Sequence, residues 1–407
     1  MLHYGQAGDP SRGVEVVATY GELDLEYSAL RKHCVLIDQP QRSVIEVTGN
    51  DRLEFLNRML TQELKGLAVN HVRRSFWLNR KGRIDADLRV INLPGRVLLD
   101  VDIEAAERTL RGLSAFVITE DVSMQSLGEA MHRFALHGPS SGELLEAIGQ
   151  APPNGTTASA LPVDRACELT LAGTQVVVVR DDSAGEPGFE IIVPTADALR
   201  IYQQLVESGH DADHGPMEPR EAAARSTLGA RVRLRPAGWH AYNIARIEAG
   251  TPLYNIDFGE KSLPAETGVL TDRVSFTKGC YLGQEIVARM HSRGHSKQVL
   301  TALKFESAGH DAFGLPAVPH AGTPLYPANN SPPPGEPSGT NEPPADALGG
   351  ISSSTLSPML GSIPIAFAQV KQSAIAPGTA LTAATEAGVV RGIVQPSLTF
   401  WQRAVPA

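Results

Sequence analysis

The chain has 407 residues, a formal net charge of −9 and 42% hydrophobic residues. This length predicts two or three domains, since a domain averages about 150 residues, and the composition is that of a soluble globular protein. The negative charge argues against a broad nucleic-acid surface, and no apolar run is long enough to span a membrane. The first ten residues carry neither the basic residues nor the apolar core of a signal peptide.

Three cysteines lie far apart in the sequence, at positions Cys34, Cys167 and Cys280. An odd and scattered set fits a reducing cytoplasm better than a disulfide framework, so we expect a cytoplasmic protein. Three scattered cysteines also cannot hold an iron–sulfur cluster within one chain. Cys280 with His291 and His295 matches no standard metal site, because a clustered acid is missing. We therefore predict no metal site.

Strands and helices alternate in short units over the first half of the chain. Strands are predicted where apolar and polar residues alternate, and helices where apolar residues recur every three or four positions. The predicted strands are 44–47, 84–91, 96–101, 116–118, 131–136, 176–180 and 189–193, and the predicted helices are 53–60, 103–113, 142–148 and 199–206. No Gly-x-Gly-x-x-Gly or Walker loop is present, which favours an α+β fold of sandwich modules over a nucleotide-binding sheet.

The pattern of apolar and polar residues changes twice in the second half of the chain. Residues 218–250 are predicted to be helical in two pieces, broken at Pro236. From residue 296 onward the pattern predicts a small antiparallel β-barrel, with strands at 297–305, 360–370, 380–384 and 389–396. Residues 307–358 are rich in Pro, Gly, Ser, Ala and Asn, so we predict that this segment is a disordered insertion.

Residues 278–285 read Lys-Gly-Cys-Tyr-Leu-Gly-Gln-Glu and precede a predicted helix. Gly279 is expected to take a conformation that a side chain forbids. Cys280 lies just ahead of the helix, with Lys278 on the same side of the chain. The lysine charge and the helix dipole both favour a thiolate. Two interpretations stay open for Cys280: a reactive thiol, or a small buried hydrophobe beside a structural turn.

This octapeptide resembles the signature of the folate-binding YgfZ-type proteins, which are relatives of aminomethyltransferase, the T-protein of the glycine cleavage system. The string Arg-Ile-Glu-Ala-Gly-x-Pro-Leu-Tyr-x-x-Asp at 246–257 resembles the same families, and residues 47–61 resemble the opening of T-protein-like chains. The resemblance implies an α+β fold in the T-protein arrangement. Two α+β modules, 1–125 and 126–295, would enclose a folate cleft and interleave, and 296–407 would form the C-terminal β-barrel.

A folate cleft needs a carboxylate, because the pterin presents a ring N–H and a 2-amino group side by side. Glu190 matches the last position of the T-protein string Gly-Glu-x-Gly-aromatic-Glu, whereas Glu186 reads as a turn residue. The alternative for Glu190 is a solvated strand carboxylate. Arg246 and Arg83 are the candidates for the carboxylates of the folate tail, and both also read as surface charges.

T-proteins carry a second acid in a Gly-Gly-x-x-Asp-Asp-Leu string. Here Asp87 matches the second aspartate of that string, Ala86 replaces the first, and Gly82-Arg83 departs from the glycine pair. The departures put aminomethyl transfer in doubt and leave folate binding open. The alternative is that Asp87 only belongs to the polar face of a half-buried strand.

The resemblance implies a tetrahydrofolate-binding accessory protein that supports the maturation or repair of iron–sulfur enzymes, including tRNA-modifying ones. Cys280, Lys278 and Asp87 would be its functional residues, with iron–sulfur client proteins as partners and no contact with membrane or nucleic acid. We expect a monomer. The alternative is an aminomethyltransferase that moves a one-carbon unit from a lipoyl carrier protein to tetrahydrofolate. A third interpretation is a scaffold with an empty cleft.

Overall fold

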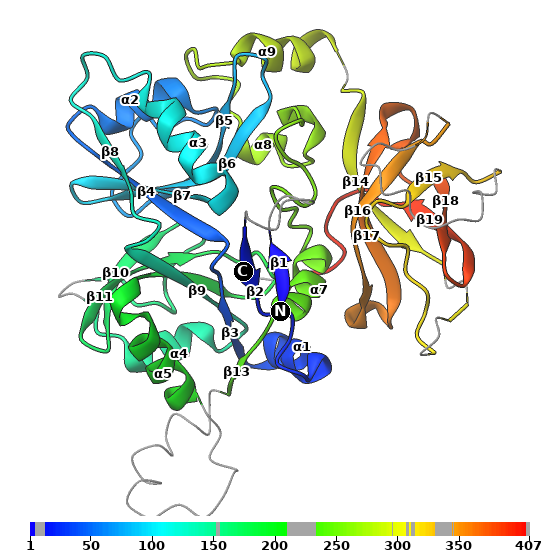
Figure 1. Cartoon of the computed structure of the whole chain (residues 1–407), viewed down its shortest axis with the longest axis horizontal. Helices are drawn as coiled ribbons and strands as arrows, with labels where there is room; N and C mark the ends of the chain where they lie inside the picture. The colour runs from blue at the N-terminus through cyan, green and yellow to red at the C-terminus, as the bar shows by residue number, and fades with distance from the viewer. Residues whose placement is uncertain are drawn as a thin grey trace, which may run out of the picture. The chain divides into compact units, whose positions relative to one another are not determined.

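The computed structural model describes residues 1–4, 13–151, 155–209, 233–294, 296–306, 309–310, 314–329, 344 and 346–403. The chain divides into two compact units, which we call unit 1 (1–77 and 86–242) and unit 2 (78–85 and 243–407) (Figure 1). The described α-helices are α1 (Leu23–Lys32), α2 (Arg52–Met59), α3 (Ile103–Ser114), α4 (Ser141–Ile148), α5 (Ala198–Gly209), α7 (Trp239–Ala249), α8 (Leu270–Arg273) and α9 (Gln284–Arg293). Within the described residues, no helix is long and apolar enough to cross a membrane.

Two sheets and a short strand pair carry unit 1. The strands are β1 (Leu2–Tyr4), β2 (Val14–Val16), β3 (Cys34–Asp38), β4 (Arg42–Thr48), β5 (Val72–Leu78), β6 (Ile84–Leu93), β7 (Arg96–Asp102), β8 (Ser123–Ser126), β9 (Met131–His137), β10 (Ala166–Leu171), β11 (Thr174–Arg180), β12 (Gly188–Pro194) and β13 (Leu234–Pro236). The five-stranded sheet has the order β5-β6-β7-β4-β8, and the six-stranded sheet has the order β10-β11-β12-β9-β3-β13.

The six-stranded sheet is buried on both faces, because successive side chains of a strand point to opposite sides. On one face, Phe134 and Ile191 pack with apolar residues of α4 and α5. On the other face, Val179 and Ile192 pack with residues from strands β4 to β7 of the five-stranded sheet. Each fully buried apolar side chain contributes about 1.5–3 kcal/mol. Polar residues that share this second face are therefore enclosed between two sheets.

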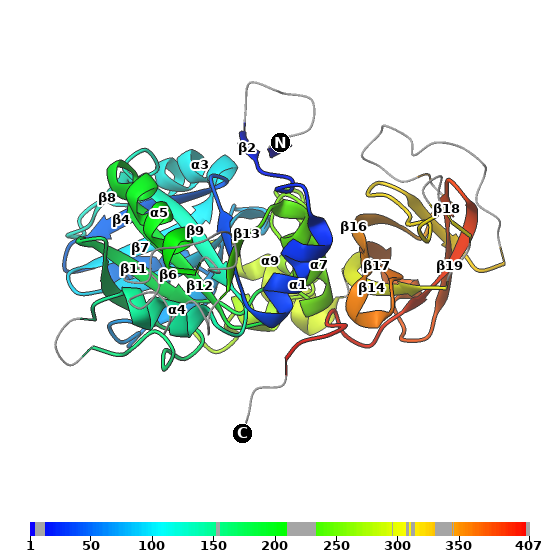
Figure 2. The same cartoon turned by 90° about the horizontal axis from the view of Figure 1, so that it is seen from below.

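Unit 2 carries a closed antiparallel barrel of six strands (Figure 2). The strands are β14 (Gln298–Phe305), β15 (Pro324–Pro327), β16 (Gly349–Ser357), β17 (Ile363–Lys371), β18 (Ala380–Thr385) and β19 (Gly388–Val394). Pairing of β14 with β19 closes the barrel, and Leu303, Phe305 and Leu381 are among the residues of its core. The predicted C-terminal β-barrel is confirmed.

The prediction that residues 307–358 are disordered is wrong for two segments, because β15 and β16 lie within this range and are strands of the barrel. The sequence of β16, Gly-Gly-Ile-Ser-Ser-Ser-Thr-Leu-Ser, is small and polar. It pairs with β17 from Gly349 to Ser357 and with β15 at its start. Pairing with its neighbours in the barrel therefore stabilises β16 as a strand, although its own composition does not favour one. Residues 330–343 lie outside the described residues.

Two further predictions differ from the structure. Residues 116–118 do not form a strand, since α3 ends at Ser114 and the next strand is β8. The ring of Phe116 instead packs edge-on against Trp77, with centroids 6.0 Å apart. Pro236 ends β13, an edge strand where a proline is tolerated, and does not divide two helices. The predicted helical residues 218–232 lie outside the described residues.

Candidate functional site

Glu190 lies in the middle of β12, on the face that packs against the five-stranded sheet. Its register partner on β9 is Ala135, and register places Arg133 and His137 diagonally on either side of it. Only 1% of Glu190 is exposed, so it is not a solvated strand carboxylate. Burial of a carboxylate is costly unless charges or donors compensate it, and the neighbouring arginines supply that compensation.

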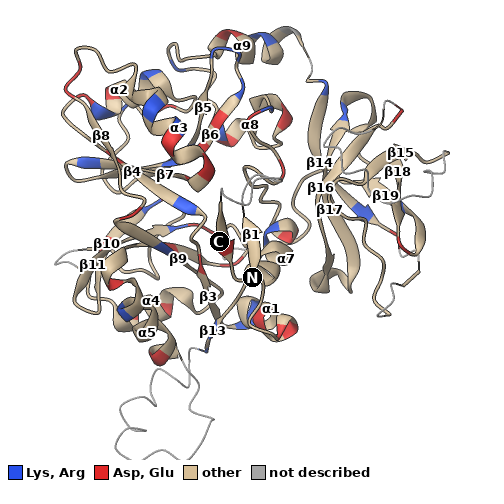
Figure 3. Ribbon diagram, viewed as in Figure 1, with Lys and Arg blue, Asp and Glu red and all other residues tan. Residues whose placement is uncertain are grey.

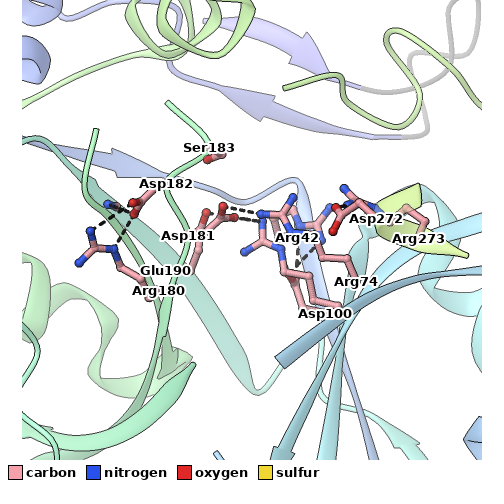
Figure 4. Close-up of polar contacts among 12 residues, drawn as sticks. Arg42, Arg74, Asp100, Arg180, Asp181, Asp182, Ser183, Glu190, Asp272 and Arg273 are labelled. Atoms are coloured by element: carbon pink, nitrogen blue, oxygen red, sulfur yellow. Dashed lines mark hydrogen bonds and ion pairs between the residues drawn. The ribbon is translucent and has the colours of Figure 1, made fainter. Parts of the chain in front are cut away.

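Glu190 and six other charged side chains form what we call the ion cluster. Its members are Arg42, Arg74, Arg89, Arg133, Asp100, Asp181 and Glu190. Four of them stand on strands of the five-stranded sheet, and the other three come from β9, β12 and the residue after β11. Figure 4 shows Arg42, Arg74 and Asp100 with their contacts beside Asp181. The cluster therefore joins the two sheets of unit 1 through their polar residues.

Arg133 and Arg89 connect the three acids. The Nε atom of Arg133 donates to Oε2 of Glu190 at 3.1 Å, and its Nη1 forms an ion pair with Asp100. The Nη2 atom of Arg89 lies 2.6 Å from Oδ2 of Asp181 and 3.7 Å from Oε1 of Glu190. Four guanidinium groups face three carboxylates, so positive charge exceeds negative charge by one. Figure 3 shows the charged residues of both sheets by sign.

The arginines decide the charge states of the buried acids. Burial by itself would raise the pKa of Asp100, but Arg133, Arg42 and Arg89 outweigh it and hold that pKa far below its ordinary value. The same opposition, with Arg74 and Arg89 as the main cations, lowers the pKa of Asp181. Both carboxylates are therefore ionised at neutral pH.

His137 sits beside the cluster in its neutral form. It is fully buried, and burial lowers its pKa although Glu190 and Asp181 act in the opposite direction. Its ring stacks on that of Tyr242, with centroids 5.5 Å apart and an interplanar angle of 27°. A Cβ at Gly188, opposite His137 in the ladder, would collide with the imidazole. Because Gly188 has no side chain, it leaves room for the imidazole ring of His137.

Several buried nitrogen atoms of this site have no hydrogen-bond partner among the described residues. They are Nη1 and Nη2 of Arg133, Nη1 of Arg89 and both ring nitrogens of His137. Buried polar atoms without partners are rare in native proteins and call for an explanation such as ordered water or a ligand. The donors of Arg133 and Arg89 fit a ligand that presents acceptors next to Glu190.

The other predicted acids take different places. Asp87 lies on β6 and is half-buried, with Ala86 buried beside it. Glu186 is 1% exposed, and its Oε1 is 3.8 Å from Nη1 of Arg31, which also donates to the carbonyl of Ala184 at 2.7 Å. Glu186 thus ties its own turn to α1, as a turn residue rather than a ligand-binding acid.

The two arginines predicted for the folate tail lie in unit 2. Arg246 on α7 is fully buried, and its Nη1 pairs with Oδ2 of Asp257 at 2.6 Å. Asp257 also accepts from Ser352 and Ser353 of the barrel strand β16. Arg246 and Asp257 thus link α7 to the barrel strand β16 within unit 2. Arg83 is exposed, and its Nη1 donates to a backbone carbonyl of the same unit.

The octapeptide precedes α9 in unit 2, as predicted. Cys280 is exposed, which excludes the interpretation as a buried hydrophobe. Lys278 is 7% exposed, and its Nζ lies 5.3 Å from the centre of the Tyr281 ring. Gly279 was expected to be the conformationally special glycine, but the left-handed one is Gly283, with φ of 81°. A Cβ at Gly283 would lie 2.8 Å from the Asn79 carbonyl oxygen.

No group of three or more metal-ligating side chains occurs in the described part of the chain. His291 stacks on Phe276, with ring centroids 3.9 Å apart. His295, the third member of the pattern considered from sequence, lies outside the described residues.

We expect Cys280 to react with iodoacetamide at least roughly tenfold faster than Cys34 or Cys167 at neutral pH. Cys34 is fully buried and burial raises its pKa, while burial and then Glu168 raise the pKa of Cys167 to about 11. Peptide mass spectrometry over time measures the three rates, and urea-unfolded protein is the control in which the differences should shrink. Equal rates in the folded protein would contradict this expectation.

Sequence reasoning found Glu190 but missed the residues that surround it. Arg133, Arg89 and Asp100 were assigned only to strands. Alternation gave no signal for them, because Arg89 shares one side of β6 with Asp85 and Asp87, and Asp100 shares one side of β7 with Asp102. Charged residues on that side of a strand are ordinarily expected to face solvent.

Comparisons with known proteins agree with this architecture. A family model described as the GCVT N-terminal domain matches residues 10–228. An aminomethyltransferase of Caldanaerobacter subterraneus subsp. tengcongensis is 27% identical over 292 residues, which are 72% of this chain and 70% of the relative. An aminomethyltransferase of Streptomyces avermitilis is 27% identical over 372 residues, 90% of this chain and 86% of the relative.

Among solved structures, the glycine cleavage system aminomethyltransferase T of Bartonella henselae matches with a TM-score of 0.75 and 19% identity, over 96% of this chain and 93% of that chain. This likeness confirms the T-protein-like fold predicted from the sequence, with its α+β part and its C-terminal barrel. Because the family model covers more than half of the sequence, the chain belongs to the family of the GCVT N-terminal domain.

Proposed function

We propose that this protein binds a reduced folate in unit 1, with Glu190 as the acceptor for the pterin ring. The observation that carries the proposal is a buried carboxylate placed between arginines that retain unpartnered donors. An ionised carboxylate has about four lone-pair sites, and Arg133 and Arg89 engage only part of them. The remaining sites suit the ring N–H and 2-amino group of a pterin. The residues present therefore fit this ligand.

We propose further that the protein is an aminomethyltransferase, because the relatives carry that name. The bound folate would supply the nitrogen that accepts a one-carbon unit from a lipoyl carrier. Glu190 would hold the pterin ring, and Arg133 and Arg89 would hold its carboxylate in place. Burial between two sheets would keep water from these contacts. Asp87 is the acid that we propose near the reacting nitrogen.

A second candidate function is favoured by the exposed Cys280 in the octapeptide and by alanine at position 86. It is the YgfZ-type accessory role, in which the folate-bound protein supports the maturation or repair of iron–sulfur enzymes and, through them, tRNA modification. Cys280 and Lys278 would then act on client proteins. In both cases we propose a monomer of the cytoplasm.

Three measurements test these proposals in order. Fluorescence titration of the full chain with tetrahydrofolate should give saturable binding, and its absence would overturn the folate proposal. Incubation with an aminomethylated lipoyl carrier and tetrahydrofolate should then release ammonia in proportion to methylene-tetrahydrofolate formed. Folate binding without ammonia release would reject the transferase and leave the accessory role. In cells lacking the homologue, full restoration of client enzymes by a Cys280→Ser variant would reject Cys280 as the residue that carries that role, and failure of the wild-type protein to restore them would reject the role itself.

A further inference from the structure

Arg133 has donors that make no hydrogen bond within the described residues. The side chain is 2% exposed. Its Nε donates to Glu190, and its Nη1 forms an ion pair with Asp100. Neither Nη1 nor Nη2 has a hydrogen-bond partner among the described residues, and Nη2 has no ion pair there either. Leaving such a buried donor unpaired is costly. The position thus combines a fixed guanidinium with a donor available for a ligand.

The geometry of the guanidinium fixes where that donor points. Guanidinium is planar, and the hydrogens on Nε and on Nη2 point in parallel from the same edge of the group. Because the Nε hydrogen is directed at Oε2 of Glu190, the Nη2 hydrogen is directed alongside the same carboxylate. The residue opposite Glu190 in the ladder is Ala135, and Gly188 is two residues away on the same face. Ala135 is too small to cover the carboxylate, whereas the imidazole of His137 fills the space over Gly188.

Glu190 and Arg133 thus present a row of polar atoms, with carboxylate acceptors followed by a guanidinium donor. A 2-amino-4-oxo pteridine presents the complementary row: the 2-amino group and ring N3–H donate, and the 4-oxo group accepts. We propose that Arg133 is a specificity-determining residue that binds the 4-oxo oxygen, so that the protein selects 4-oxo pterins over their 4-amino analogues. The inference rests on the proposed folate function and adds the feature of the ring that is recognised.

The 4-amino analogue reverses the pattern at two adjacent positions. Its ring N3 carries no hydrogen when the ring is neutral, so Glu190 loses a donor and meets a lone pair. Its 4-amino group directs hydrogens toward the hydrogen on Nη2 of Arg133. Sites built around buried hydrogen bonds discriminate strongly against ligands that leave those groups unpaired. We therefore expect the analogue to bind about 100-fold more weakly than tetrahydrofolate, or worse.

The experiment compares tetrahydrofolate with 4-amino-4-deoxytetrahydrofolate by calorimetric or fluorescence titration of the full chain, at a mildly alkaline pH where the ring of the analogue is neutral. Arg133→Lys keeps the positive charge but removes the planar guanidinium. We expect this variant to reduce the ratio of the affinities for tetrahydrofolate and its 4-amino analogue by roughly tenfold or more. Arg96→Lys is the matched control on a partly exposed arginine, which pairs with Glu46 at 3.1 Å, and it should keep the wild-type preference. Thermal unfolding confirms that each variant is folded.

The possible outcomes separate this inference from the function on which it rests. Equal affinity of the wild-type protein for both ligands would overturn the inference and leave folate binding intact, and this comparison needs no variant. A preference that persists undiminished in folded Arg133→Lys would overturn the assignment to Arg133. Failure of the wild-type protein to bind either ligand would overturn the proposed function together with the inference.

Discussion

Glu190→Gln should weaken the binding of tetrahydrofolate by about 2–4 kcal/mol, or roughly 30-fold to 1000-fold in Kd. Glutamine has nearly the same volume, so the packing between the sheets is kept. Its amide oxygen can still accept from Nε of Arg133, the partner of Glu190 at 3.1 Å. The amide nitrogen, however, presents donors where the ligand also presents donors. Titration of wild type and variant under the same conditions measures the loss.

The matched control is Glu168→Gln, on β10 of the same sheet. The Glu168 side chain is 28% exposed, and its Oε1 lies 3.8 Å from Nη2 of Arg96, so its ion pair is worth little. This variant should bind folate like wild type. If Glu190→Gln binds as tightly as wild type while remaining folded, the pterin ring is held elsewhere and the assignment of Glu190 is wrong.

Asp100→Asn should destabilise the protein by about 3–5 kcal/mol, the cost of breaking a buried ion pair from one side. Asp100 is fully buried, its carboxylate is 3.0 Å from Nη2 of Arg42, and it also pairs with Arg133 and Arg89. Asparagine removes the charge that offsets these three cations and adds donors that oppose theirs. The free energy of unfolding from urea titration measures the effect. Asp197→Asn, at a surface pair with Arg200, should cost less than about 1 kcal/mol.

The same carboxylate makes a prediction about acid stability. Its folded-state pKa is lowered well below the ordinary aspartate value, so its contribution is complete above about pH 4 and is lost as the pH falls from there toward the folded pKa. In that window, the wild-type unfolding free energy should fall more steeply with acidification than that of Asp100→Asn, by up to about 1.4 kcal/mol per pH unit. Parallel curves for the two proteins would contradict the charged state of Asp100.

The sequence by itself determined the local elements with clear periodicity and the place of one key residue. Alternation predicted β9 and β12, and the helical period predicted α4 and α5. The motif made Glu190 a candidate for the binding site, and the barrel followed from a series of short alternating strands. These features depend on residues that are near one another in the chain, which is why the sequence carries them.

The tertiary structure decided which charges meet. Arg89 and Asp181 are 92 positions apart, yet Nη2 of Arg89 lies 2.6 Å from the carboxylate of Asp181, because their two sheets pack face to face. Nothing in local periodicity specifies such a partner, since an ion pair depends on distance in space.

Strand assignments failed for the same reason. The apolar run of β3, Cys34–Asp38, was not predicted to be a strand. In the structure it is a strand because β9 and β13 pair with it. The serine-rich β16 is a strand only because two barrel neighbours bond to it. Strand formation depends more on cross-strand partners than on intrinsic preference, and those partners are fixed only when the whole chain has folded.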